Sequence, residues 1–366
     1  MKDELIYQIS LTLVDGIGAV QAKSLIDKFG SATNVFQTNI NHVEAIEGIG
    51  TIRARSIKNF VNFSDAETEL SFCLKHNIEP LFITDTNYPK RLLNCFDAPT
   101  MLYYKGNADL NNAKVVTIIG TRSNTDYGKS VTEKLVEGLA AHNVLVVSGL
   151  ALGIDAIAHK SALHNELQTV GVLGHGLDTI YPAQNKSLAK EMIQQGGLIT
   201  EFKKGITPEA FNFPRRNRIA AGMADVTVAV ETQRKGGSMI TAELAYQYNR
   251  DLFAVPGRLT DHKSSGCNYL IQQNKAVIYT DVEEFIKTMG WELNQKKSHK
   301  KQRELFIELT PEEEIIMNIF REKEITHIDE LHTRSGLNSS SIAAAVLNME
   351  LQNIILSMPG KIYKVL

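Results

Sequence analysis

The sequence predicts an α/β protein built on a doubly wound, mostly parallel sheet, with helical residues before the sheet and a winged-helix-like segment after it. Between residues 65 and 290, short β-branched apolar runs alternate with helical stretches. Such runs are typical of strands buried on both faces, and their spacing suits βα units. A sheet of this kind binds its ligand outside the carboxyl ends of its strands. The runs are 115–120, 144–149, 169–174, 226–231, 252–257 and 276–280.

The length of 366 residues exceeds one ordinary core, so we expect several domains. The composition changes predict a helical domain over 1–64, the α/β domain over 65–290, a basic linker over 291–305 and a winged-helix-like domain over 306–366. The linker includes "NQKKSHKKQRE", which suits either a solvated spacer or a nucleic-acid contact.

The bulk charge and the cysteines exclude several classes of site. A net charge of −2 means that any nucleic-acid site must be a local patch. Cys73, Cys95 and Cys267 lack CxxC spacing, so we expect neither a disulfide framework nor a metal site. No apolar run approaches a membrane span and no signal peptide pattern is apparent, so a cytoplasmic protein without a membrane partner is expected.

The first 64 residues contain an internal repeat. Gly-Ile-Gly occurs at 16–18 and again at 48–50, each time followed by a helical pattern with small and basic residues. This looks like a tandem helix-hairpin-helix, in which a Gly-rich turn brings backbone N–H groups close to a phosphate. A purely structural pair of helices remains an equal alternative.

The last segment has winged-helix order. Pro311 and the acidic residues after it mark a helix start. A helix, a turn and a second helix follow, and "IILSMPGKIYKVL" indicates two strands around a Pro-Gly turn. The second helix, expected over 338–352, contains no Lys or Arg. Helices that read DNA normally carry such residues, so we favour protein contact or packing.

The residues at the strand ends favour a polyphosphate ligand. GxGxxG after a strand and GxxxxGK[ST] are both absent, so a nucleotide cofactor is disfavoured and none is expected. Cations gather at these strand ends instead. The arginine guanidinium pairs well with phosphate oxygens, so this gathering favours a ligand with several phosphates. The cations are Arg122, Arg215, Arg216, Arg218 and Lys235. Small residues that could offer backbone N–H groups are Thr121, Ser148, Gly149, Gly236, Gly237 and Ser238.

The stretch "FPRRNRIAAG" opens a helix with several of these arginines. Arg215 and Arg218 share a helical face, whereas Arg216 points elsewhere. We therefore expect Arg215 and Arg218 to hold DNA with Arg122 and Lys235, and Arg216 to make a salt bridge or a lesser contact. Asn217 should tie down a neighbouring loop. A salt-bridged helix start is the alternative. Phe211, Phe213 and Tyr181 could stack on unpaired bases.

Catalytic patterns are weaker. Asp155 and His159 are spaced i, i+4 and could act as an acid–base pair, but a buried structural pair is the favoured interpretation. Glu243, after "GGSMITA", resembles the acidic position of nucleotide-hydrolysing enzymes on this fold. No catalytic residue is therefore assigned, although an enzyme remains an alternative.

Taken together, "IIGTR", "SGLALGIDAIAH", "FPRRNRIAAG", "KGGSMITAELA" and "GCNYLIQQNKAV" resemble the DNA processing protein A (DprA or Smf) family over roughly residues 80–285. The resemblance implies a Rossmann-like domain that binds single-stranded DNA, forms a homodimer, loads the RecA recombinase during natural transformation and lacks catalytic activity. It implies a phosphate-binding motif at Gly120, Thr121 and Arg122. It also implies contacts from Phe213, Arg215, Asn217, Arg218, Lys235 and Ser238.

Two rival functions remain. One is an enzyme similar to nucleotide phosphoribohydrolases, which share the fold. The other is a regulator that binds double-stranded DNA through the C-terminal domain.

Overall fold

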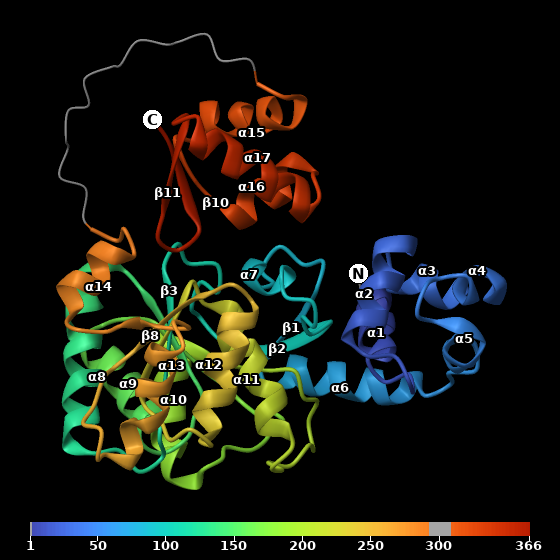
Figure 1. Ribbon diagram of the computed structural model, residues 1–366. Helices are drawn as coiled ribbons and strands as arrows, with labels where there is room; N and C mark the ends of the chain where they lie inside the picture. The colour runs from blue at the N-terminus through green and yellow to red at the C-terminus, as the bar shows by residue number, and fades with distance from the viewer. Residues whose placement is uncertain (1, 293–308) are drawn as a thin grey trace. The chain divides into compact units, whose positions relative to one another are not determined.

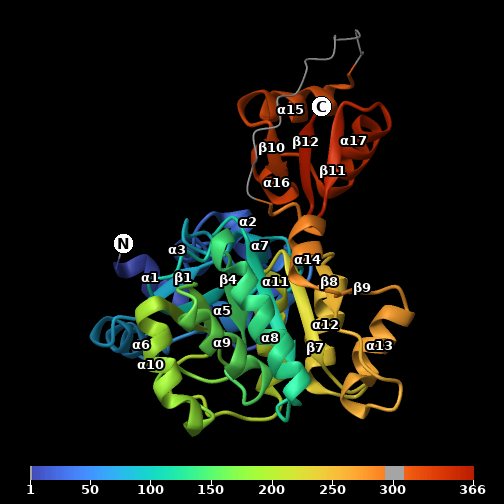
Figure 2. The same cartoon turned by 90° about the vertical axis from the view of Figure 1, so that its left-hand side faces the viewer.

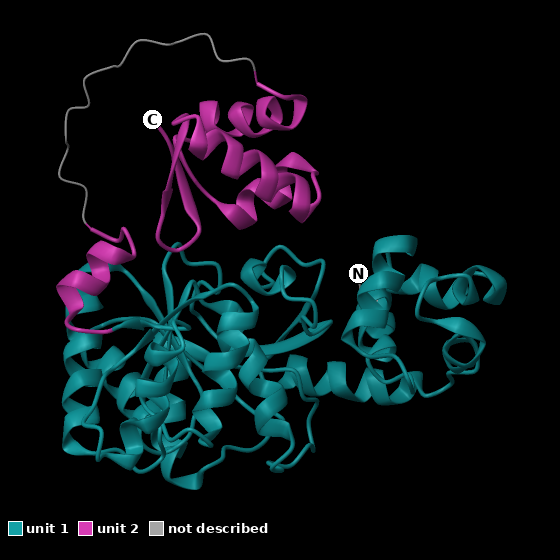
Figure 3. Ribbon diagram, in the orientation of Figure 1, with its two compact units in different colours: residues 1–278 teal, residues 279–366 magenta. Residues whose placement is uncertain are grey.

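The computed structural model describes residues 2–292 and 309–366 and divides the chain into two compact units (Figure 3). Unit 1 spans Met1–Ile278 and unit 2 spans Tyr279–Leu366. The basic linker predicted over 291–305 lies almost entirely outside the described residues. No helix among the described residues is both long enough and apolar enough to cross a membrane.

Unit 1 begins with six helices, and the two Gly-Ile-Gly repeats form the turns that precede the second and the fifth. Gly16 and Gly48 both have φ of 79°, a backbone conformation that disfavours side chains. The Arg53 side chain donates to the carbonyls of Gly16 and Gly48, each at 2.8 Å, and so ties the two turns together. The helices are α1 (Lys2–Leu11), α2 (Ala19–Phe29), α3 (Ala32–Gln37), α4 (Ile40–Glu44), α5 (Gly50–Lys58) and α6 (Phe63–Lys75).

A nine-stranded sheet forms the centre of unit 1, in the order β1-β2-β6-β5-β4-β3-β7-β8-β9 (Figure 1). The pairs from β6 to β9 are parallel, while β1 and β2 join antiparallel at one edge. The strands are β1 (Glu79–Phe82), β2 (Met101–Gly106), β3 (Val115–Gly120), β4 (Leu145–Ser148), β5 (Thr169–Val172), β6 (Gly196–Thr200), β7 (Val226–Glu231), β8 (Asp251–Ala254) and β9 (Val277–Ile278). The doubly wound, mostly parallel sheet is therefore confirmed.

Helices cover both faces of this sheet (Figure 2). Neighbouring residues of β6 show the two layers: Leu198 packs with Met192 of α10, whereas Ile199 joins the core that contains Ile219 of α11. Adjacent side chains on a strand point to opposite faces, so α10 and α11 lie on opposite sides. The remaining helices are α7 (Lys90–Leu93), α8 (Asp126–Leu139), η1 (Ala140–His142), α9 (Ile154–His164), η2 (Ala183–Asn185), α10 (Lys186–Gln195), α11 (Asn212–Met223), α12 (Gly237–Gln247), η3 (His262–Ser264) and α13 (Ser265–Gln272).

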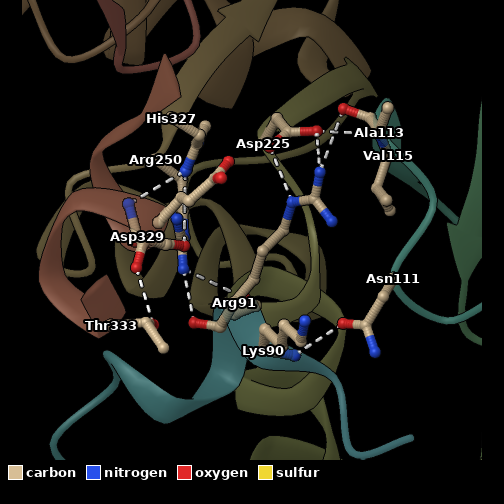
Figure 4. A network of polar contacts seen from close by, with 12 residues as sticks. Lys90, Arg91, Asn111, Ala113, Val115, Asp225, Arg250, His327, Asp329 and Thr333 are labelled. Carbon is tan, nitrogen blue, oxygen red and sulfur yellow. Dashed lines mark hydrogen bonds and ion pairs between the residues drawn. The ribbon is translucent and has the colours of Figure 1, made fainter. Parts of the chain in front are cut away.

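A polar network fixes the amino ends of β3 and β7 (Figure 4). The Arg91 guanidinium pairs with Asp225 at 2.6 Å, and Asp225 also accepts the N–H of Val115 at 2.8 Å. Arg250, the residue before β8, donates to the Arg91 carbonyl at 2.6 Å and so ties α7 to the start of that strand. These contacts hold β3 and β7 side by side, so that their carboxyl ends also meet.

Unit 2 has winged-helix order, as predicted. Its elements are α14 (Val282–Thr288), α15 (Pro311–Glu322), β10 (Ile325–His327), α16 (Ile328–Ser335), α17 (Ser339–Leu351), β11 (Ile355–Met358) and β12 (Ile362–Val365). The strands form an antiparallel sheet in the order β10-β12-β11. Thr310 and Glu313 form a capping box that starts α15 where the sequence places a helix start. A separate core includes Phe320, Leu331 and Ile342.

Candidate nucleic-acid interface

A cleft of about 790 Å³ lies at the carboxyl ends of β3 and β7. The chain runs from β3 through β4 and β5 to β6 on one side, and then crosses to β7 on the other side of β3. In doubly wound sheets such a reversal opens a crevice for ligands. The lining includes Gly120, Thr121, Arg122, Gly149, Phe213, Arg216, Asn217, Gly236, Gly237 and Ser238.

Close backbone packing forms the wall of the cleft after β3. A side-chain Cβ on Gly120 would lie 2.4 Å from Ile154 of α9, and one on Gly153 would lie 2.2 Å from the Thr121 carbonyl. The Ile154 N–H donates to that carbonyl at 3.2 Å. Glycines are therefore needed here because the loop rests directly on the start of α9.

Arg122 is exposed at the rim of the cleft. Its guanidinium carbon lies 5.5 Å from the centroid of the Phe213 ring, and the Phe213 and Tyr181 rings are 6.0 Å apart. This group places a cation beside two aromatic faces, one of which, Tyr181, is exposed. A phosphate and an unpaired base could both be bound by such a group.

Arg216 lies deeper, with 7% of its surface exposed. Its guanidinium donates to the Val172 carbonyl, while its Nε has no hydrogen-bond partner among the described residues. A Cβ on Gly149 would come within 2.3 Å of Arg216 and 2.5 Å of Asp155, so a larger residue there would force these side chains to move. Burial lowers the pKa of Arg216 and raises that of Asp155, while the opposite charge of each partner counteracts both shifts.

The predicted grouping of the arginines on α11 is correct, but the predicted side of the helix that meets the cleft is wrong. Arg215 and Arg218 do share a face, since both reach Glu201 Oε2, at 3.4 and 2.6 Å. That face meets carboxylates rather than the cleft, because Arg218 also approaches Asp97 Oδ2 at 3.6 Å. Arg216, expected to point elsewhere, lines the cleft with Arg122 instead. The Arg218 side chain is only 15% exposed, whereas Arg215 is 55% exposed.

The start of α12 forms the opposite wall. Gly236 is the N-cap, and Ser238 Oγ donates to Thr232 Oγ1 at 2.7 Å. Asn217 donates to the carbonyl of Gly237, the first residue of α12, at 3.4 Å, so its partner is a helix start rather than the loop that the sequence suggested. The first amides of a helix carry partial positive charge and favour an anion. Lys235 is exposed in the loop that precedes α12.

Other predicted residues have structural partners. Ser148 is fully buried and donates to the Ile118 carbonyl at 2.6 Å, so its side chain does not reach the cleft. Asp155 and His159 do not pair with each other: His159 lies 2.6 Å from Thr169 Oγ1 and 2.5 Å from the Gly149 carbonyl. Burial lowers the pKa of His159 to about 4, so the ring is neutral at pH 7.

The carboxylates near the cleft are also engaged. Glu243 accepts from Lys275 Nζ at 2.7 and 2.9 Å. Glu231, which the sequence did not single out, is fully buried at the end of β7 and accepts the Thr125 N–H at 2.9 Å. Its position at a strand end was visible in the sequence, but its role in fixing the start of α8 depends on tertiary packing.

A family model described as "DNA recombination-mediator protein A" matches residues 79–290. The chain belongs to the DprA/Smf family. A second DprA/Smf model, "DprA winged helix domain", matches residues 305–361. Protein Smf of Escherichia coli (strain K12) is 32% identical over 329 residues, or 87% of each chain. DNA processing protein DprA of Streptococcus pneumoniae is 40% identical over 196 residues, which cover 54% of this chain and 69% of that protein.

Two solved structures of DprA/Smf proteins resemble this chain. DNA processing protein A from Streptococcus pneumoniae superposes with a TM-score of 0.67 at 32% identity, covering 77% of this chain and 97% of that one. DNA processing protein A from Helicobacter pylori, described with its single-stranded DNA binding mode, has a TM-score of 0.53 at 35% identity. That match covers 58% of this chain and 94% of the other. The family places this chain among DNA-processing proteins.

Proposed function

We propose that the cleft at the ends of β3 and β7 binds single-stranded DNA. The observation that carries the proposal is the combination of the exposed Arg122, the deep Arg216 and the open start of α12 around one cavity of about 790 Å³. Cations and helix-start amides together suit phosphates, and the Phe213 and Tyr181 rings offer stacking faces that paired bases cannot reach. The Helicobacter pylori relative, described by its single-stranded DNA binding mode, supports the proposal.

The contributions of individual residues follow from their exposure. Arg122 and Lys235 would contact the backbone directly, and Thr121, Gly149, Gly237 and Ser238 would line its path. Gly120 and Phe213 shape the cleft. Arg215 is exposed on the face of α11 that meets Glu201, so DNA would reach it only outside the cleft, whereas Arg218, in the middle of α11, ties this helix to Glu201.

The test is a competition between strands. A labelled oligonucleotide of deoxythymidine bound to the full chain should be displaced by unlabelled single strands at far lower concentration than by a duplex of equal length. Equal competition by the duplex would contradict the proposal, because stacking on aromatic faces requires unpaired bases.

We further propose that the protein acts as a recombination mediator in the cytoplasm, protecting incoming single-stranded DNA and loading RecA during natural transformation. The family description as a recombination mediator supports this role. Addition of the chain should shorten the lag before RecA forms filaments on single strands coated with a single-strand-binding protein. If the protein still binds DNA but leaves the lag unchanged, the RecA-loading role is contradicted and the DNA-binding proposal is not affected.

A homodimer would place two clefts on one DNA strand. The edge strand β9 supports self-association, because Val277 and Ile278 are 50% and 47% exposed at the end of the sheet. Sedimentation equilibrium of the wild type should give twice the chain mass, and Ile278→Lys should lower it. A monomer for the wild type at micromolar concentration would contradict this part of the proposal.

We assign no catalytic activity to the cleft. Three engaged carboxylates support this assignment: Glu243 is paired with Lys275, Glu231 is buried against the start of α8, and Asp155, which lines the cleft, lies beside the Arg216 guanidinium. Release of free base from nucleoside monophosphates, measured by chromatography, should stay at the background level. Turnover that is lost in Glu243→Gln would instead favour the hydrolase alternative.

A further inference from the structure

A second group of cations lies beyond the cleft, at the carboxyl ends of β7 and β8. Arg234 is exposed in the loop after β7, and Arg258 is exposed in the loop after β8. Lys263 is half-buried in η3, later in that second loop. None of the three lines the cleft, and none forms an ion pair with a residue that the structure describes. Their charges are therefore available to a ligand.

The carboxylates near these cations are turned toward the protein. Asp261 accepts the Lys263 N–H at 2.9 Å and so serves to cap η3. Glu231, at the end of β7, is fully buried. Asp126 is exposed, but it lies in the first turn of α8, where the helix amides offset its negative charge. The surface at the ends of β7 and β8 therefore presents mainly positive charge.

Tight packing joins this group of cations to the wall of the cleft. Thr232 and Gln233 line the cleft, and the Gly266 N–H of α13 donates to the Thr232 carbonyl at 2.8 Å. A Cβ on Gly266 would lie 2.7 Å from that carbonyl, so α13 packs on the loop after β7 without an intervening side chain. The Arg234 guanidinium lies 4.3 Å from the centroid of the Tyr269 ring, also on α13. Because β7 and β8 are parallel neighbours, both loops leave the same edge of the sheet.

The loop after β8 is fixed by side chains from two helices. The Tyr127 hydroxyl of α8 donates to the Pro256 carbonyl at 3.0 Å. Asn268 of α13 accepts the Gly257 N–H at 3.1 Å and donates to the Gly257 carbonyl at 2.9 Å. A ligand that binds an ordered loop loses less free energy to loop ordering. The Tyr127 ring is still 49% exposed, so it offers a stacking face for an unpaired base.

We propose that a single DNA strand bound in the cleft continues over the ends of β7 and β8, where Arg234, Arg258 and Lys263 bind its phosphates. The inference rests on the proposed function, because the cleft fixes where this strand begins. Unpaired guanidinium and ammonium groups suit phosphate oxygens. From β7 the path runs by β8 toward the edge strand β9. The strand would then occupy more nucleotides than the cleft alone can hold.

Strand length separates this extended path from the cleft. Full-length protein with both Arg258→Ala and Lys263→Ala loses two side-chain charges but keeps the backbone contacts of the loop. Its affinity for an oligonucleotide of deoxythymidine of about 20 nucleotides should fall at least ten-fold, whereas affinity for one of about 4 should stay within two-fold of the wild type. Arg122→Ala should weaken binding of both lengths. Equal weakening of both lengths by the double variant would overturn the proposal. No weakening of either length, as expected if these cations served an acidic protein partner, would also overturn it.

The dependence of affinity on salt gives a second readout. For the long oligonucleotide, the double variant should make the log-log slope shallower by about 1.4, because each of two phosphates contributes about 0.7. Lys134→Ala with Lys160→Ala removes two exposed cations from α8 and α9 and should leave this slope unchanged. Sedimentation should give the wild-type mass for both double variants, and a lower mass for the loop variant would overturn the proposal. Wild-type protein that binds neither oligonucleotide would instead contradict the proposed function itself.

Discussion

The cleft of unit 1 and the helix α17 of unit 2 both belong to folds that commonly bind nucleic acid, yet their surfaces differ in chemistry. The cleft combines Arg122, Arg216 and the open start of α12, whereas the outer side of α17 presents alanines and leucines. Phosphate binding depends on cations and oriented amides rather than on the fold that carries them. Winged-helix order alone therefore does not assign DNA binding to unit 2.

The same lesson applies within the cleft region, where arginines close in sequence have different environments. Arg122 is exposed beside Phe213, while Arg218 is held by Glu201 and Asp97. Carboxylates that pair with an arginine occupy its N–H donors and neutralise its positive potential, so it attracts a phosphate weakly. An exposed, unpaired arginine keeps both its donors and its potential for a phosphate. Substitutions at the two positions should therefore separate stability from binding.

The largest expected effect is on stability, in Arg218→Ala. Loss of this guanidinium leaves Glu201, whose side chain is 8% exposed, without its main partner. Removing one member of a buried ion pair costs about 3–5 kcal/mol of the free energy of unfolding. Urea denaturation should show this loss, while Lys129→Ala, which breaks the exposed pair with Glu133, should cost less than about 1 kcal/mol. Similar losses in both variants would contradict the assigned environment of Arg218.

A slightly smaller effect is expected on binding, in Arg122→Ala. A charge-assisted hydrogen bond contributes about 1.5–3 kcal/mol, so affinity for single-stranded DNA should fall roughly 10- to 100-fold. The free energy of unfolding should hardly change, because Arg122 is exposed. Fluorescence anisotropy with a labelled oligonucleotide measures the affinity, and Lys129→Ala is the matched loss of a surface cation. If both variants bind like the wild type, Arg122 does not contact the DNA.

The pH dependence of stability should reveal the buried His159 beneath the cleft. Its folded pKa of about 4 lies below the unfolded value of 6.5, so its contribution is complete above pH 6.5 and is lost as pH falls toward 4. Between pH 7 and pH 4 the wild type should lose roughly 3 kcal/mol more than His159→Asn. The neighbouring Asp155 titrates in both proteins and largely cancels in this comparison. Parallel pH profiles would show that His159 is not buried in its neutral form.

The smallest effect is expected when unit 2 is altered. Leu347→Asp with Leu351→Asp places two carboxylates on the outer side of α17, which would repel DNA if this surface bound it. Affinity for single-stranded and for double-stranded DNA should stay within two-fold of the wild type. A loss of ten-fold or more would return unit 2 to the DNA-binding surface and weaken the contrast with the cleft.

Much of the fold was predictable from local patterns, because β-branched runs and glycine-rich ends identify buried parallel strands. The strands β1, β2 and β6 were missed for local reasons. β1 contains Pro80, β2 is rich in tyrosine rather than branched residues, and β6 begins with Gly196-Gly197. Such compositions match neither the continuous β-branched run of a strand buried on both faces nor the apolar–polar alternation of a strand buried on one face.

The facing of the arginines could not be predicted from spacing alone. Helical periodicity correctly groups Arg215 with Arg218, but it does not say which side of α11 meets the cleft. That side is decided by Glu201 and Asp97, which come from distant segments of the chain, and by Gly149, which leaves room for Arg216. Periodicity defines faces, whereas tertiary packing decides what each face meets.

The dependence of single-stranded DNA affinity on salt tests the central claim most directly. If the cleft binds the phosphate backbone, the logarithm of the affinity should fall linearly with the logarithm of salt concentration, by about 0.7 per phosphate neutralised. Arg122→Ala should make this slope shallower by about 0.7, while Lys129→Ala should leave it unchanged. A flat salt response of the wild type, or equal slopes for the wild type and Arg122→Ala, would contradict binding of the phosphate backbone at this cleft.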